Sequence, residues 1–126
     1  MEKNHNILIA DNESIVTFDL KDQLNKWGYT VLTSNGNNST TRDLIKENNP
    51  DAVIIDDDYP FLEEGIKTAE RISRQYRIGI VLLCAWMNDE VERMSSKLDS
   101  FQCLSKPFTN GELQKSLEFI LKKKAN

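Results

Sequence analysis

Acidic residues follow two short apolar runs in this sequence. Asp56, Asp57 and Asp58 come directly after the residues AVII, and Asp11 comes directly after ILIA. Like charges that meet in a partly buried cleft repel one another, so such a cluster needs a cation to neutralise it. Carboxylate and carbonyl oxygens are the ligands that Mg²⁺ prefers, and Mg²⁺ commonly serves phosphoryl chemistry. The acids therefore indicate half of a magnesium site.

Hydrophobic periodicity alternates between strand and helix along the chain. Short apolar runs predict strands, and apolar residues spaced three or four apart predict helices, the last of which begins with the capping-box pair Thr109 and Glu112. We expect strands at 6–11, 30–33, 52–56, 78–85 and 101–105, and helices within 12–29, 42–48, 62–72, 88–98 and 109–121.

Five strands that alternate with five helices through short connections predict an α/β fold, a doubly wound parallel sheet with helices on both faces. The length of 126 residues suits one domain, 1–126, with its core at about 5–124. Ligands of such sheets bind outside the carboxyl ends of the strands. That edge would bring Asp11, Asp56 and Lys106 together, since each comes at or after the end of a strand.

The composition excludes several classes of function. The net charge of −4 predicts no general attraction to nucleic acid or to an anionic membrane. The apolar stretches are too short to cross a bilayer, and the polar N-terminus lacks the apolar core of a signal peptide, so we expect a cytoplasmic protein. His5 is the single histidine, which argues against histidine-based catalysis.

Four motifs and a glycine occur in order along nearly the whole chain: ILIADNE, PDAVIIDDDYP, Gly65, IVLLCA and LSKPF. Together they resemble the motifs of response-regulator receiver domains, the phospho-accepting half of two-component signalling. The resemblance implies a flavodoxin-like sheet with strand order 2-1-3-4-5. It also implies a signalling domain that phosphorylates itself and turns over no separate substrate, so we do not expect an enzyme.

By position within these motifs, Asp56 resembles the phosphoacceptor, Lys106 the lysine that contacts the phosphoryl group, and Asp11 the first residue of an acidic pair. A cis bond is expected between Lys106 and Pro107. Implied ligands of Mg²⁺ are Asp11, Asn12, Asp56 and the backbone carbonyl of Asp58. Implied partners are a sensor histidine kinase or phosphotransfer protein as donor, and a downstream protein at the face of the fourth helix, fifth strand and fifth helix.

Three residues depart from the pattern of the family. Asn12 stands where a second acid usually binds the metal, and a neutral amide is expected to bind Mg²⁺ more weakly. Cys84 stands where a Ser or Thr hydroxyl usually bonds the phosphoryl group, and Cys103 where an aromatic residue usually takes part in the same switch. We interpret the cysteines as two small apolar residues in a reducing cytoplasm; the alternative is a disulfide that locks the output face.

Two other functions stay open. A degenerate receiver would bind partners without phosphorylation, and Asn12 and Cys84 favour it. A small flavodoxin-like redox protein or phosphohydrolase is the second alternative, but the sequence has no glycine-rich phosphate loop. The leading prediction is a receiver that takes a phosphoryl group onto Asp56 with Mg²⁺ and acts as a phosphorelay intermediate or stand-alone regulator.

Overall fold

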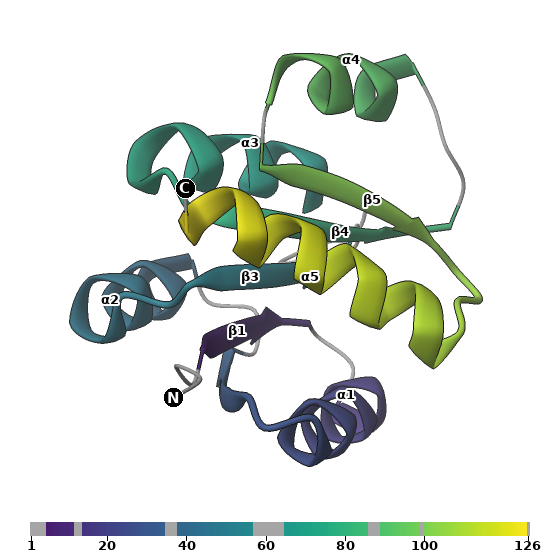
Figure 1. Cartoon of the computed structure of the whole chain (residues 1–126). Helices are drawn as coiled ribbons and strands as arrows, with labels where there is room; N and C mark the ends of the chain where they lie inside the picture. The colour runs from purple at the N-terminus through teal and green to yellow at the C-terminus, as the bar shows by residue number, and fades with distance from the viewer. Residues whose placement is uncertain are drawn as a thin grey trace.

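A parallel sheet lies between two layers of helices (Figure 1). The structure, a computed structural model, describes residues 5–11, 14–34, 38–56, 65–85, 89–98 and 100–125. The strands follow the order β2-β1-β3-β4-β5 and every pair is parallel, as predicted. The strands are β1 (Asn6–Ala10), β2 (Thr30–Ser34), β3 (Ala52–Asp56), β4 (Gly79–Cys84) and β5 (Phe101–Ser105). The helices are α1 (Ser14–Lys26), α2 (Asn38–Asn48), α3 (Gly65–Tyr76), α4 (Asp89–Lys97) and α5 (Asn110–Ala125). Within those ranges, no helix is long and apolar enough to cross a membrane.

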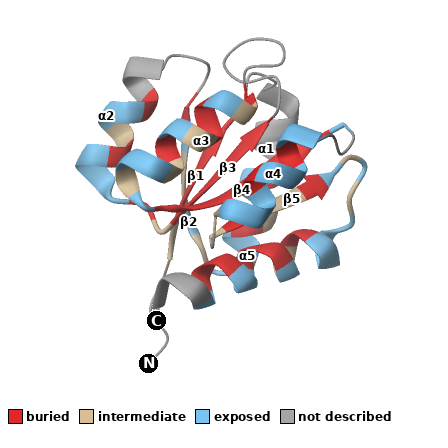
Figure 2. Cartoon of the chain, turned by 90° about the horizontal axis from the view of Figure 1, so that it is seen from above, coloured by how far each residue is buried: buried red, intermediate tan, exposed pale blue. Residues whose placement is uncertain are grey.

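The central strands β3 and β4 are buried at every residue. Their sequences, AVIID and GIVLLC, show no apolar–polar alternation, because helices cover both faces of a parallel sheet. The edge strand β2 is buried only at Ser34. Burial therefore decreases from the centre of the sheet to this edge, as the colours of Figure 2 show.

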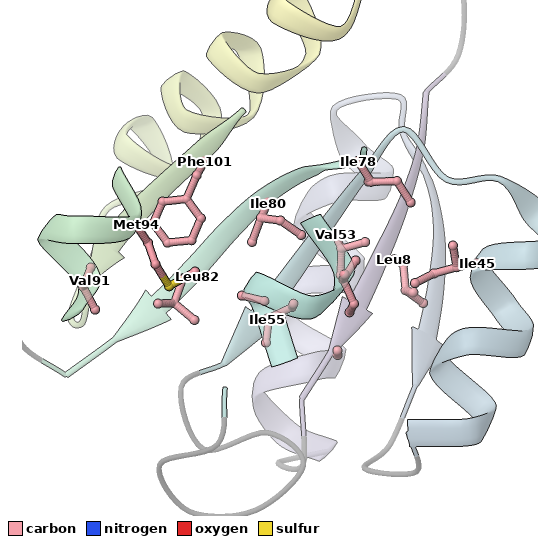
Figure 3. Close-up of a cluster of buried hydrophobic side chains, with 13 residues drawn as sticks. Leu8, Ile45, Val53, Ile55, Ile78, Ile80, Leu82, Val91, Met94 and Phe101 are labelled. Atoms are coloured by element: carbon pink, nitrogen blue, oxygen red, sulfur yellow. The ribbon is translucent and has the colours of Figure 1, made fainter. Parts of the chain in front are cut away.

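Each face of the sheet has its own hydrophobic cluster. Ile7 and Ile9 of β1 belong to the cluster on the face covered by α1 and α5, whereas Leu8 and Ala10 belong to the cluster on the other face. From α1 and α5 the first cluster takes Leu20, Leu24, Leu113, Leu117, Ile120 and Leu121. The second cluster, drawn in Figure 3, takes Ile45, Ala69, Ile72, Val91 and Met94 from α2, α3 and α4.

Two helix boundaries test the expectations from sequence. Gly28 follows α1 with φ of 96°, a left-handed conformation that suits glycine, so the end of this helix is confirmed. The α2 helix begins at Asn38, four residues earlier than expected. Its first turn, NSTT, is polar, and the buried Thr41 hydroxyl lies 2.6 Å from that of Ser34. This turn shows no apolar periodicity, which explains why the sequence placed the start of α2 too late. Residues 62–64 of the expected third helix lie outside the described residues.

The α5 helix begins with the capping box that the sequence predicts. The Thr109 hydroxyl accepts a hydrogen bond from the Glu112 backbone N–H at 3.1 Å, and a Glu112 carboxylate oxygen accepts one from the Thr109 N–H at 3.0 Å. These bonds satisfy backbone donors at the helix start. They fix the start of α5 shortly after Lys106.

Replacing Thr109 by alanine is expected to lower the free energy of unfolding by about 1 kcal/mol, because the acceptor for the Glu112 N–H is lost. Thr109→Ser keeps a hydroxyl and serves as the control. Urea denaturation followed by circular dichroism measures both variants. An alanine variant as stable as the serine variant would contradict this role of the capping box.

Candidate functional site

Two buried carboxylates lie at the carboxyl edge of the sheet. Asp56 is the last residue of β3, and Asp11 directly follows β1. Ala10 pairs with Ile55, so the next residue on each strand, Asp11 and Asp56, comes at the same level of the sheet. The backbone N–H of Asp11 donates to the Ser34 carbonyl of β2 at 3.3 Å. The fold therefore brings together the two acids that the sequence predicts to share a site.

Lys106 reaches the same site from the loop after β5. Its Nζ donates a hydrogen bond to Asp56 Oδ2 at 3.0 Å, and the lysine and aspartate side chains are 34% and 11% exposed. The backbone N–H of Lys106 donates to the Cys84 carbonyl at 2.8 Å, which holds this loop against the end of β4. The peptide bond between Lys106 and Pro107 is cis, as predicted. Because the ion pair is partly buried, solvent screens it less than it screens an exposed pair.

This geometry places a carboxylate, a group that can serve as a nucleophile, beside a cation. The Lys106 ammonium compensates the negative charge of Asp56 at a position with little access to water. A phosphoryl group on Asp56 would add further negative charge within reach of the same ammonium. The Lys106 ammonium is therefore placed to balance the charge of the Asp56 carboxylate and also the larger negative charge that a phosphorylated Asp56 would carry.

The acids at this edge also suit a hard cation. Asp11 and Asp56 supply two carboxylates, the ligand chemistry that Mg²⁺ prefers. Over the described ranges, no group of three or more His, Cys, Asp or Glu side chains could hold a metal ion. The other two expected ligands, Asn12 and the carbonyl of Asp58, lie outside the described residues. The donor set thus fits part of the expected Mg²⁺ site.

The two cysteines form a disulfide between β4 and β5, with Cα atoms 6.8 Å apart. Our interpretation of Cys84 and Cys103 as two separate apolar residues is therefore wrong, and the bond that the alternative requires is present. Leu82 pairs with Cys103 and Cys84 with Ser105, so the cysteines occupy diagonal positions on neighbouring strands. Periodicity identifies the two strands but not their register, which is why the sequence left this pairing open.

The expected output face lies at the β5 edge of the sheet, where α4 and α5 both contact β5. Arg93 and Lys97 of α4 are exposed there, and Gln102 of β5 is partly exposed. A guanidinium nitrogen of Arg93 lies 3.7 Å from a carboxylate oxygen of Glu70 on α3, a contact that the sequence did not indicate. This ion pair connects α4 to its neighbouring helix.

Comparison with known proteins finds relatives over most of the chain. The family model for the response regulator receiver domain matches residues 7–118. The transcriptional regulatory protein PdtaR of Mycobacterium tuberculosis is 27% identical over 115 residues, which cover 91% of this chain and 56% of that protein. The chemotaxis protein CheY of Bacillus subtilis is 29% identical over 106 residues, which cover 82% of each chain.

Solved structures share the architecture. The signal receiver domain of an HD domain-containing protein from Pseudomonas fluorescens Pf-5 superposes with a TM-score of 0.84 at 22% identity, and the match covers 98% of both chains. This likeness bears on the fold alone. The chain spans about half the length of several of the curated relatives it matches, PdtaR among them.

Proposed function

We propose that this chain, which belongs to the response regulator receiver domain family, accepts a phosphoryl group on Asp56. The donor in this proposal is a sensor histidine kinase or a phosphotransfer protein. The observation that carries the proposal is the 3.0 Å hydrogen bond from Lys106 Nζ to Asp56 Oδ2 at the carboxyl edge of the sheet. This is the edge at which doubly wound folds bind their ligands.

Asp56 acts as the nucleophile in this proposal. One of its carboxylate oxygens attacks the phosphorus of the donor in line, an oxygen–phosphorus bond forms, and the bond between phosphorus and the donor breaks. Lys106 stays within hydrogen-bond reach and balances the charge that spreads over the phosphoryl oxygens. The product is an acyl phosphate, whose lability suits a transient signal.

We further propose that Asp11 and Asp56 hold Mg²⁺ together with Asn12 and the backbone carbonyl of Asp58. When bound there, Mg²⁺ would neutralise charge on the carboxylates and on the phosphoryl oxygens. Asp11 comes level with Asp56 on the neighbouring strand, which suits a shared ion. Because the Asn12 amide is neutral, we expect weaker binding than a second carboxylate would give.

The signal would pass to a downstream protein through the surface of α4, β5 and α5. A phosphoryl group on Asp56 can change the populations of two arrangements of that surface. The size of this change is set by the difference between its interaction free energies with the two arrangements. Since the phosphoryl group goes to the chain itself, no turnover of a separate substrate is proposed. We also propose a cytoplasmic location, because the sequence is polar and carries a net negative charge.

Incubation with acetyl phosphate and Mg²⁺ tests the proposal. The intact mass is expected to increase by one phosphoryl group in the wild type and to stay unchanged in Asp56→Asn, because the variant lacks the carboxylate nucleophile. Asp43→Asn, which alters an exposed carboxylate of α2, is the matched control and should gain the group as the wild type does. A wild type that gains no mass would contradict the proposal and support a degenerate receiver, which the disulfide-bonded Cys84 favours.

A further inference from the structure

The disulfide joins β4 and β5, two strands that border the candidate site. In the register of the sheet, Leu83 of β4 lies beside Asp56, and the next residue, Cys84, lies beside Ser105 of β5. The Cys84 carbonyl also accepts the hydrogen bond from the Lys106 backbone N–H at 2.8 Å. The cross-link therefore joins β5, whose following loop carries Lys106, to β4, the strand that lies between β5 and the Asp56-bearing strand β3.

The same disulfide lies in the layer that supports α4. Cys103 packs against the cluster that contains Val91 and Met94, the two buried side chains of α4. Figure 3 labels these two side chains of α4. This helix has 9 residues, and its main contacts are with β5 and α3. A helix this short is held mainly by what it packs against. The strand that carries Cys103 is therefore a principal support of α4.

The two cysteine residues differ in their exposure to solvent. Cys84 is 1% exposed, whereas Cys103 is partly exposed. Thiol–disulfide exchange begins when a thiolate reaches one sulfur of the disulfide, so access decides which sulfur is attacked. Attack on Cys103 would release Cys84 as the leaving thiolate inside the protein.

We propose that Cys84 and Cys103 are a reversible redox pair, in which Cys103 is the attacked sulfur and the disulfide fixes α4 and β5 on the sheet. A thiolate of a dithiol reductant attacks Cys103 Sγ, the bond between the protein sulfurs breaks, and Cys84 leaves as a thiolate that takes up a proton. The second thiol of the reductant then displaces Cys103. Two electrons and two protons pass to the protein, and the reductant becomes a cyclic disulfide. Exchange with a small disulfide such as oxidised glutathione reverses the reaction.

The output face, formed by α4, β5 and α5, differs in stability between the two redox states. The disulfide joins positions separated by 19 residues, and the loop that it closes contains the whole of α4. Closing such a loop restricts the unfolded chain, and reduction removes the restriction. In a reducing compartment, disulfides are usually transient and serve redox chemistry or sensing. The redox state thus acts on the surface through which the proposed phosphorylation would signal. This redox effect does not depend on phosphorylation.

Hydrogen exchange of the full chain in two redox states tests the proposal. With dithiothreitol, amides of α4 and β5 are expected to exchange about tenfold faster than after treatment with oxidised glutathione, while those of α1 on the opposite face change less. The Cys84→Ser/Cys103→Ser variant is the control and should exchange at the fast rates under both conditions. Equal rates in the two states of the wild type would overturn the proposal. No phosphoryl donor is present, so the result is independent of the proposed function.

Single-cysteine variants compare the access of a reagent to each sulfur, on which the choice of Cys103 as the attacked sulfur depends. Cys103 in the Cys84→Ser variant is expected to react with a chromogenic aryl disulfide about tenfold faster than Cys84 in the Cys103→Ser variant, because only Cys103 is partly exposed. Equal rates, or a faster Cys84, would overturn the assignment. If a serine variant does not fold, glutathione adducts trapped on the wild type answer the same question. An adduct on Cys103 supports the assignment and one on Cys84 overturns it.

Discussion

Gly79→Ala is expected to lower the free energy of unfolding by about 3 kcal/mol. Gly79 begins β4 and is buried, and a Cβ atom added there would overlap the Cγ2 methyl of Ile120 and lie 3.3 Å from its Cβ. Ile120 is fully buried in the interface between α5 and the sheet, so its side chain cannot turn into solvent. The strand and the helix would have to separate. The loss is large beside the total stability of a small domain, about 5–15 kcal/mol.

Two further variants isolate this clash. Gly111→Ala makes the same change in the first turn of α5, where the atom nearest the added Cβ is Thr109 Oγ1 at 3.8 Å, so stability should stay the same or rise slightly. Ile120→Leu in the Gly79→Ala background removes the overlapping methyl and should recover part of the lost stability. Urea denaturation followed by circular dichroism measures all three. A Gly79→Ala variant as stable as the wild type would show that α5 does not pack this closely on β4.

The strands could be predicted from sequence because a parallel sheet leaves a simple pattern. Both faces of β3 and β4 are covered, so each strand is apolar up to its last residues. The start of α2 could not be predicted in this way. Its first turn is held by the hydroxyl contact between Thr41 and Ser34, and this contact joins two elements. The apolar periodicity of one segment contains no information about such a contact.

The candidate site could be predicted as far as topology determines it. Strand ends of a doubly wound sheet meet at one edge, so Asp11, Asp56 and Lys106 become neighbours once the strands are assigned. The pairing of Cys84 with Cys103 needs more information, because it depends on the register of β5 against β4. A shift of two residues in that register would separate the sulfurs and leave the buried face of each strand unchanged.

Lys106→Met is expected to slow the phosphorylation of Asp56 by acetyl phosphate about 10²–10³-fold. The lysine ammonium donates to Asp56 Oδ2 at 3.0 Å, and methionine retains an unbranched side chain without the charge or the donor. The charge that develops on the phosphoryl oxygens would therefore lose a cation held in place before the reaction. Intact-mass measurements over time, at fixed acetyl phosphate and Mg²⁺, give the rate.

Matched variants separate the chemical role of Lys106 from a structural one. Lys97→Met makes the same change at an exposed position of α4 and should keep the wild-type rate. Lys106→Arg retains the charge and should recover part of the rate, since a planar guanidinium does not reproduce the position of an ammonium. Removing Lys106 also leaves the buried Asp56 charge beside Asp11, so stability should fall and should recover when Asp56→Asn is added. Phosphorylation of Lys106→Met at the wild-type rate, together with this loss of stability, would show that the ion pair serves the fold and not the reaction.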